Sequence, residues 1–222
     1  MPKVTSEYME NKRRQIVDAA YQVCLRKPAE MVTISDVIAE TGMSQGAIYR
    51  YYAGLDEIFM DMISNMRREY SIIGQMEEII ADKSLTFEET TYKICDCLAD
   101  VMEEHLMDIQ KINFDFGVIA INEPERFSKI MSGLTSKGSM DYLGSEVFPK
   151  LMMGAGQLGY KINGSPEELL IYIASTYTGI EKYCIMGACY SLGDISKKIE
   201  PRKLFRTFAK TLILLIGGDT NA

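Results

Sequence analysis

The stretch from Thr33 to Phe59, TISDVIAETGMSQGAIYRYYAGLDEIF, constrains the fold of this chain most strongly. Thr33 precedes an apolar pattern at helical spacing, and Asp36 follows three residues later, which is typical of a capped helix start. Gly42 predicts an abrupt helix end, because glycine accepts the left-handed backbone that such an end requires. Ser44 then predicts the cap of a second short helix. Two short helices around a tight turn predict a helix-turn-helix, which places its second helix in the major groove of DNA.

The second helix is predicted to carry small and polar side chains on its outward side. Gln45 can pair with adenine, and Arg50 can bond a guanine or a phosphate. Small residues let the helix lie close to the groove floor, and tyrosine hydroxyls can reach backbone phosphates. We therefore predict DNA contacts at Thr33, Ser44, Gln45, Gly46, Ala47, Tyr49, Arg50 and Tyr51.

The segment before this stretch completes a three-helix unit. Apolar residues recur at helical spacing between Ile16 and Cys24, so residues from about 8 to 27 are predicted to form an amphipathic helix. Lys12, Arg13 and Arg14 lie near its start, where they suit a phosphate contact.

Residues 12–59 resemble the N-terminal domain of the TetR family of bacterial transcriptional repressors. The matching pieces are KRRQIVDAA, TISDVIAETGMS, GAIYRYY and the acidic start of the next helix. Two positions depart from the family pattern. Leu55 stands where the family usually has a lysine that contacts a phosphate, and Lys27-Pro28-Ala29-Glu30 stands where it usually has a glycine-containing loop.

The resemblance implies an all-α fold with two parts. Residues 1–54 would be a three-helix helix-turn-helix DNA-binding domain, and residues 55–222 a helical effector-binding and dimerisation domain. The expected function is a ligand-responsive transcriptional regulator, normally a repressor. It would bind a palindromic double-stranded DNA operator as a homodimer and be released by a small-molecule effector.

The charge of the chain is unevenly distributed. Its formal net charge is -7, but residues 1–54 carry a balance of +1 and the remainder a balance of -8. Between Thr41 and Gly54 there is one cation, Arg50, and no acid. Since the local potential at the DNA face governs counterion release, we expect modest non-specific affinity and a need for a dimer.

Past Gly54 the pattern is helical throughout. An apolar stripe from Leu55 to Met66 predicts a long fourth helix, a break follows near residues 81–84, and another helix is predicted from Thr86 to about Leu106. Residues 124–160 are predicted to form shorter helices interrupted by glycines. The sequence has no clear strand alternation, repeat or low-complexity tract.

The last two predicted helices suggest a dimer interface. The first, residues 166–192, opens with Ser165-Pro166 and is apolar nearly all round, which indicates contacts on several faces. The second spans residues 201–217. The resemblance implies that both pair with their symmetry mates as a four-helix bundle; the alternative is that they are only intrachain core.

The part between is rich in methionine, with 15 in the whole chain, many of them between Met60 and Met153. Methionine adapts to irregular cavities and recurs at promiscuous apolar surfaces, which predicts a pocket for a small apolar or aromatic effector. Ordinary core filling is the alternative for each residue. Acids at Glu103, Glu104, Asp115 and Glu181 leave open a cationic ligand. The candidate ligand-binding residues are Met62, Met66, Met102, Phe114, Phe116, Tyr142 and Tyr177.

Other classes of protein find little support. His105, the single histidine, is interpreted as a solvated or helix-capping residue, and no nucleophile elbow or phosphate loop is present, so we predict no enzyme, no metal and no cofactor. The five cysteines are interpreted as small core residues, including Cys95, Cys97, Cys184 and Cys189. No apolar segment follows Met1-Pro2-Lys3, and the longest strongly apolar run, Leu212 to Ile216, is too short to span a membrane, so a cytoplasmic protein is expected.

A different function remains open at this point. The acidic charge and Leu55 are also compatible with a small-molecule-binding helical dimer that acts through protein contacts, with negligible DNA binding. Binding to the promoter region of its own gene separates the two.

Overall fold

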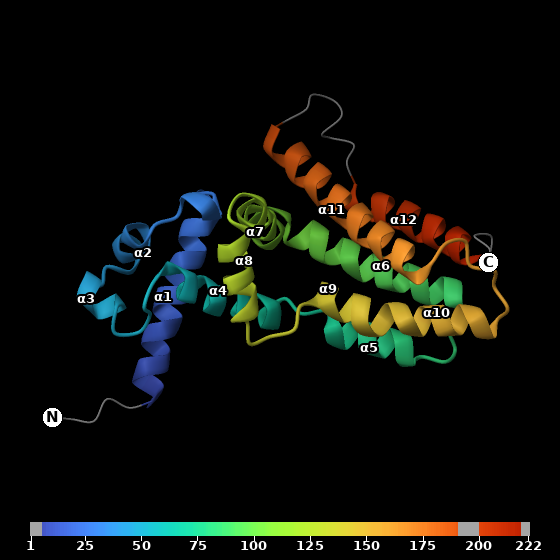
Figure 1. The fold of residues 1–222 in the computed structure, drawn as a ribbon, viewed down its shortest axis with the longest axis horizontal. Helices are drawn as coiled ribbons and strands as arrows, with labels where there is room; N and C mark the ends of the chain where they lie inside the picture. Colours follow the sequence, from blue (N-terminus) through green and yellow to red (C-terminus); the bar gives the residue numbers. More distant parts are fainter. Residues whose placement is uncertain (1–5, 191–199, 219–222) are drawn as a thin grey trace. The chain divides into compact units, whose positions relative to one another are not determined.

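The computed structural model describes residues 6–190 and 200–218, and within these ranges every regular element is a helix (Figure 1). The predicted all-α class is thereby confirmed. Two predictions concern residues outside these ranges. The expected lack of a secretory segment rests on residues 1–3, which are not among the described residues. The predicted helix 166–192 includes residues 191–192, which are not among them either.

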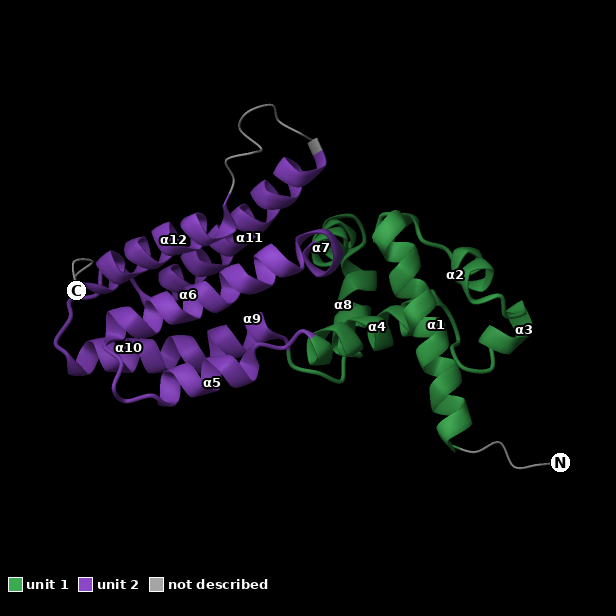
Figure 2. Ribbon diagram, turned by 180° about the vertical axis from the view of Figure 1, so that it is seen from behind, with its two compact units in different colours: residues 1–69, 111–137 green, residues 70–110, 138–222 purple. Residues whose placement is uncertain are grey.

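The chain forms two compact units, and neither is a single continuous stretch (Figure 2). Unit 1 comprises Met1–Glu69 and Lys111–Lys137, and unit 2 comprises Tyr70–Gln110 and Gly138–Ala222. The backbone therefore passes from one unit to the other three times. The functional division at residues 54 and 55 stays a prediction.

Unit 1 is built around the first helix. Its elements are α1 (Ser6–Arg26), the 3₁₀ turn η1 (Ala29–Met31), α2 (Ile34–Thr41), α3 (Gln45–Ile48), α4 (Leu55–Glu69), α7 (Lys111–Asn122) and α8 (Pro124–Ser132). The apolar stripe predicted on α1 is buried, with Ile16, Ala20 and Cys24 fully inaccessible. Helix α1 packs against both α2 and α4, so it is the support on which the helix-turn-helix is mounted.

Helices α4 and α7 complete the apolar core of unit 1. Ile58, Phe59 and Met62 form the buried stripe of α4, in agreement with the sequence pattern. Phe59 meets Phe116 of α7 edge to face, with ring centroids 5.1 Å apart, a favoured aromatic geometry. Two segments distant in sequence thus share one apolar core.

Unit 2 is a layered helical bundle. Its elements are α5 (Ile73–Ala81), α6 (Phe87–Glu104), the π turn η2 (Leu106–Gln110), α9 (Ser139–Tyr142), the π turn η3 (Leu143–Val147), α10 (Phe148–Gln157), α11 (Pro166–Tyr190) and α12 (Pro201–Ile216). Helix α6 runs between α12 on one side and α5 and α10 on the other (Figure 1). Thr86 caps α6 by accepting a hydrogen bond from the Glu89 N–H while Glu89 bonds back, which explains why the helix begins there.

Two sequence expectations differ from the structure. Cys189, interpreted from sequence as a core residue, is exposed, because it lies on an outward turn of α11. Cys24, Cys95 and Cys184 are buried as expected, and Cys97 is half-buried. The predicted fourth helix is also separated from the break at residues 81–84 by a further helix, α5.

Candidate nucleic-acid interface and ligand pocket

The start of α2 is fixed by a compact polar cluster. The Thr33 hydroxyl accepts from the Asp36 N–H at 3.3 Å, and the Asp36 carboxylate accepts from the Thr33 N–H at 2.7 Å, which completes a capping box. The Lys27 ammonium lies 2.7 Å from the same carboxylate. Hydrogen bonds from Lys27 and Thr33 lower the pKa of Asp36 to about 2. The cap predicted from sequence is confirmed, and it occupies the Thr33 hydroxyl.

The turn and the second helix follow the predicted chemistry, but the helix is shorter than expected. Gly42 has a φ of 65°, the left-handed conformation that ends α2. Ser44 caps α3 by accepting from the Ala47 N–H at 3.3 Å. Helix α3 ends at Ile48, and the chain continues to Tyr51 in tighter turns, with the Tyr51 N–H bonded to the Ile48 carbonyl at 2.9 Å. Such tightening satisfies carbonyls at a helix end that no further helical residue reaches.

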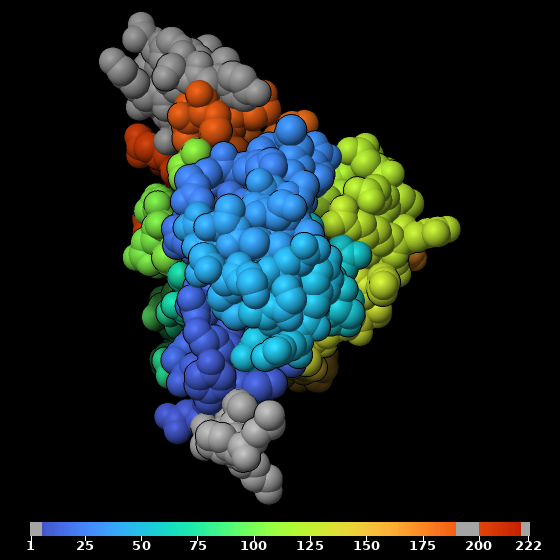
Figure 3. Space-filling view, turned by 90° about the vertical axis from the view of Figure 1, so that its left-hand side faces the viewer, coloured from blue at the N-terminus to red at the C-terminus, as the bar shows by residue number. Residues whose placement is uncertain are grey.

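The outward face of α3 is open to solvent (Figure 3). Ile48 is fully buried and anchors the helix from below, whereas Tyr49 is 46% exposed. Ala47 and Tyr51 are half-buried, and the other predicted DNA-contacting residues are exposed: Thr33, Ser44, Gln45, Gly46, Tyr49 and Arg50. All eight are therefore on accessible surface of one unit, and their role in binding DNA stays a prediction.

A polar network holds the corner after α3 in place. The Tyr52 hydroxyl donates to the Asp61 carboxylate of α4 at 2.8 Å, and the Arg13 guanidinium of α1 lies 4.6 Å from the centroid of the Tyr52 ring. Arg13 also reaches Asp61 at 3.5 Å. Burial and the hydrogen bond to Asp61 raise the pKa of Tyr52 above its ordinary value of 10.0, which favours the protonated phenol that donates this bond. The segment that follows α3 is thus tied to both supporting helices.

The acidic start of α4 has a partner that the local sequence does not indicate. Leu55 is half-buried there, and the acidic pair behind it is already engaged. Glu57 accepts from the Ala53 N–H at 2.8 Å, and Asp56 accepts from the Arg126 guanidinium of α8, also at 2.8 Å. Arg126 is distant in sequence, so no local motif reveals this partner.

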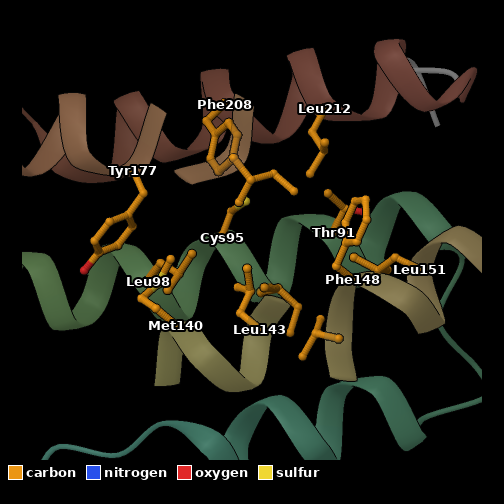
Figure 4. Close-up of a pocket in the computed structure, with 13 residues that line it drawn as sticks. Thr91, Cys95, Leu98, Met140, Leu143, Phe148, Leu151, Tyr177, Phe208 and Leu212 are labelled. Carbon is orange, nitrogen blue, oxygen red and sulfur yellow. The ribbon is translucent and has the colours of Figure 1, made fainter. Parts of the chain in front are cut away.

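An apolar cavity lies inside unit 2 (Figure 4). Its volume is about 20 Å³, close to the room that one water molecule needs. Ligand pockets are typically several hundred Å³, so a larger occupant requires its walls to move. The lining side chains come from α6, α9, η3, α10, α11 and α12: Thr91, Ile94, Cys95, Leu98, Met140, Leu143, Val147, Phe148, Leu151, Ile173, Tyr177, Phe208 and Leu212.

The predicted ligand-binding residues do not gather at this cavity. Tyr177 lines it, and Met102 and Tyr142 are buried elsewhere in the core of unit 2. The other four belong to unit 1: Met62, Met66, Phe114 and Phe116. The methionine content does not locate the cavity, because some methionines are buried, such as Met62 and Met102, whereas Met107 and Met153 are exposed. The cavity residues that it misses are mostly leucine, isoleucine and valine, whose pattern does not differ from that of any core helix.

The acids that left open a cationic ligand are dispersed. Asp115 pairs with Lys111 at 3.0 Å, and Glu103 pairs with Arg202 at 3.3 Å, while Glu104 is exposed. Glu181 is 8% exposed, and burial raises its pKa to about 7. These placements leave the cationic ligand an untested alternative.

The single histidine lies where a capping residue is expected. His105 occupies the C-terminal cap position of α6, and its Nδ1 lies 3.2 Å from the Asp108 carboxylate. In residues 6–190 and 200–218, no three His, Cys, Asp or Glu side chains cluster in a way that could hold a metal ion. Across the same ranges, none of the helices combines the length and apolar character needed to cross a bilayer.

Comparison with known proteins agrees with this geometry. The family model described as "Bacterial regulatory proteins, tetR family" matches residues 16–62. The chain is 31% identical over 113 residues to the uncharacterized HTH-type transcriptional regulator YfiR of Bacillus subtilis (strain 168), covering 48% of this chain and 55% of that protein. It is 26% identical over 80 residues to the HTH-type transcriptional repressor Rv1474c of Mycobacterium tuberculosis, covering 36% of this chain and 43% of that protein. The chain thus spans about half the length of the curated relatives it matches.

A solved structure extends the likeness in fold. The chain is similar to Thermus thermophilus FadR, described as a TetR-family transcriptional repressor in complex with lauroyl-CoA. The TM-score is 0.58 and the sequence identity 15%, with 91% of this chain and 94% of that chain covered. At this identity the likeness concerns the fold alone.

Proposed function

We propose that this chain, which belongs to the TetR family of transcriptional regulators, acts as a ligand-responsive repressor in the cytoplasm. It binds a palindromic operator as a homodimer and is released by a small apolar effector. The observation that carries the proposal is the exposed face of α3, held by buried Ile48 and by the caps at Thr33 and Ser44.

The surface of α3 that we propose to contact DNA bases is short. Because α3 has a single turn, the base contacts come from Gln45 at its start and Arg50 just after its end. Gly46 and Ala47 allow close approach to the groove floor, and the hydroxyls of Tyr49, Tyr51 and Ser44 serve phosphates. Thr33, whose hydroxyl donates to the Asp36 carboxylate at 2.7 Å, contributes to this surface by fixing the start of α2.

The proposed dimer uses the outer faces of α11 and α12. Large apolar side chains are exposed there in the protomer: Leu170, Ile171, Tyr183, Met186 and Leu214. Ile171 is 60% exposed, a poor arrangement for an isolated chain and a good one for a surface that pairs with a copy of itself. To dock together on a palindromic operator, the α3 helices of the two protomers must lie about one DNA turn apart, roughly 34–36 Å.

The proposed effector is apolar and elongated. The cavity of unit 2 is lined almost entirely by hydrocarbon side chains from six elements, which favours an aliphatic chain over a charged ligand. The lauroyl-CoA bound by the fold relative carries an aliphatic chain of this kind, joined to a charged coenzyme A group, and its acyl chain supports the proposed class. An effector acts only through different affinities for the DNA-binding and released states.

Fluorescence anisotropy with a labelled DNA fragment from upstream of its own gene tests the proposal. We expect specific binding by the wild type, release by lauroyl-CoA, and at least about tenfold weaker binding by Arg50→Ala. Lys150→Ala, a cation removed from exposed α10, serves as the matched control and should bind as the wild type does. Absence of any specific fragment at physiological salt would favour the alternative of a regulator that acts through protein contacts.

The dimer is tested separately by sedimentation. Ile171→Glu should yield monomers and lose operator binding, because a charge would be buried in the pairing surface. Met153→Glu on α10, where the side chain is 65% exposed, should remain dimeric. Identical behaviour of the two variants would place the interface elsewhere.

A further inference from the structure

The cavity of unit 2 has two hydroxyl-bearing wall residues, and they differ in where their hydrogen bonds lead. The Thr91 hydroxyl donates to the Phe87 carbonyl at 2.9 Å, within its own helix α6. The Tyr177 hydroxyl of α11 donates to the side-chain carbonyl of Gln110 at 3.1 Å, in the π turn η2. Displacement of Tyr177 therefore disturbs a hydrogen bond to a residue outside the cavity wall. Displacement of Thr91 disturbs only a hydrogen bond within α6.

Tyr177 is well placed to detect an occupant. It lies at one end of the cavity, and its hydroxyl points away from the other labelled side chains (Figure 4). Its ring is backed by Phe205, which is fully buried, at a centroid separation of 6.0 Å. Since the cavity holds about 20 Å³, any occupant larger than water must displace its walls, and Tyr177 closes one end.

Gln110 ends an element with alternative hydrogen-bonding patterns. Its N–H donates to the His105 carbonyl at 3.0 Å, the five-residue spacing of a π turn, and the residue is only 2% exposed. Single π turns recur at functional sites, and the hydrogen bonding of this turn differs from α-helical pairing by one residue in the carbonyl that accepts. A buried amide that loses its partner must find another, so loss of the Tyr177 bond favours such a shift.

The next residue, Lys111, belongs to unit 1 and holds the connection between α1 and α2. Its ammonium donates to the Cys24 carbonyl in the last turn of α1 at 3.1 Å and to the Asp115 carboxylate at 3.0 Å. Asp115 in turn accepts from the Ala29 N–H at 3.2 Å, at the start of η1. One peptide bond thus separates the partner of a cavity wall from the anchor of the helix-turn-helix support.

We propose that Tyr177 and Gln110 are positioning residues that convert occupancy of the cavity into a change at the α1–η1 junction, through the peptide link from Gln110 to Lys111. The inference rests on the proposed function in one respect, that an occupant of this cavity is the signal. The coupling itself is a property of the ligand-free protein and needs no DNA to be measured.

Hydrogen exchange followed by mass spectrometry tests the coupling in ligand-free protein. Tyr177→Phe keeps the ring and removes the hydroxyl. We expect about fivefold faster exchange, equivalent to about 1 kcal/mol, in peptides covering residues 106–111 and also residues 24–33. Peptides of α4 should not change. Acceleration that stops at Gln110 would show a role confined to unit 2 and overturn the proposal.

Two further variants separate this link from a general loss of stability. Tyr172→Phe removes a hydroxyl from the same helix, where the ring packs near Phe208 at 5.9 Å, and should leave residues 24–33 unchanged. An equal effect from Tyr172→Phe would overturn the specific link. If Tyr177→Phe does not fold, Gln110→Met removes the bond from the other side and should give the same two accelerated regions. Failure of DNA binding by the wild type would be a separate result that concerns the proposed function.

Discussion

Among single residues, Asp36 shows how a local polar cluster contributes to the stability of the helix-turn-helix. Its pKa is lowered to about 2 from an ordinary value of 3.8 by Lys27 and Thr33, so its charged form stabilises the fold above about pH 4. That contribution is lost as the pH falls from about 4 to about 2. We expect Asp36→Asn to lower the Tm at pH 7, with the difference from wild type shrinking over this acid range. Thermal unfolding followed by circular dichroism measures it.

The exposed Asp18 on α1 provides the control for this experiment. Asp18→Asn should leave the Tm near that of the wild type at every pH, since surface changes away from caps and buried networks are usually small. A Tm difference for Asp36→Asn that persists unchanged at pH 2 would contradict the assigned cause.

Glu181 has the opposite dependence on pH. Burial raises its pKa from 4.5 to about 7, so the protonated form is favoured in the folded state. Its effect on stability is therefore most favourable below about pH 4.5 and is lost as the pH rises from 4.5 to 7. Glu181→Gln should stabilise the protein at pH 8 by at most about 3 kcal/mol and flatten the loss between pH 5 and 7. Urea unfolding at several pH values measures this, with exposed Glu78→Gln as control.

At the scale of elements, two glycines with left-handed backbone make different demands. Gly42 ends α2 with a φ of 65°, and a Cβ added there would meet no other atom within 4 Å. Gly217 ends α12 with a φ of 94°, and its Cβ would lie 2.8 Å from the Lys161 carbonyl oxygen. Gly42→Ala should cost about 1–2 kcal/mol from backbone strain alone. Gly217→Ala should cost more, because backbone must also shift; equal losses in urea unfolding would contradict this.

Local signals explain which elements could be predicted well from the sequence. The caps at Thr33 and Ser44 and the left-handed end at Gly42 depend on residues within a few positions of one another. A short stretch of sequence therefore contains both partners of each interaction, and the helix ends can be predicted from it. The sequence pattern extends the second helix to Arg50, whereas α3 ends at Ile48 and the corner after it is held by contacts of Tyr52 with Asp61 and Arg13. Such contacts lie outside any short sequence window.

The cavity was beyond prediction for a similar reason. Its wall combines side chains from α6 to α12, and each contributes ordinary apolar residues that a buried helix face would carry in any case. Methionine and aromatic content identifies interior residues such as Met102 and Tyr142, but it does not distinguish a wall from filler. The hydrogen bond between Tyr177 and Gln110 joins residues with no sequence signal in common.

For the whole molecule, the two units predict the behaviour of fragments. A fragment of residues 1–54 contains α1, α2 and α3 but lacks Phe59 and Phe116, which complete the core of unit 1. We expect it to be largely unfolded by circular dichroism at about 25 °C, because the part of the α1 apolar stripe that packs against α4 stays exposed. The full chain under the same conditions is the control. A helical fragment with a cooperative thermal transition would show that α1–α3 suffice.

The backbone passes between the two units three times, which also limits how one unit can be exchanged between related proteins. A chimera that joins unit 1 to the ligand-binding unit of another protein cannot be made with a single junction after Glu69. Helices α7 and α8 also belong to unit 1, and such a junction would leave them out. Lys111 and Arg126 would be left behind with them, and they hold the α1 terminus and the start of α4. Exchange of specificity between relatives with this layout therefore requires transplanting the intervening helices as well.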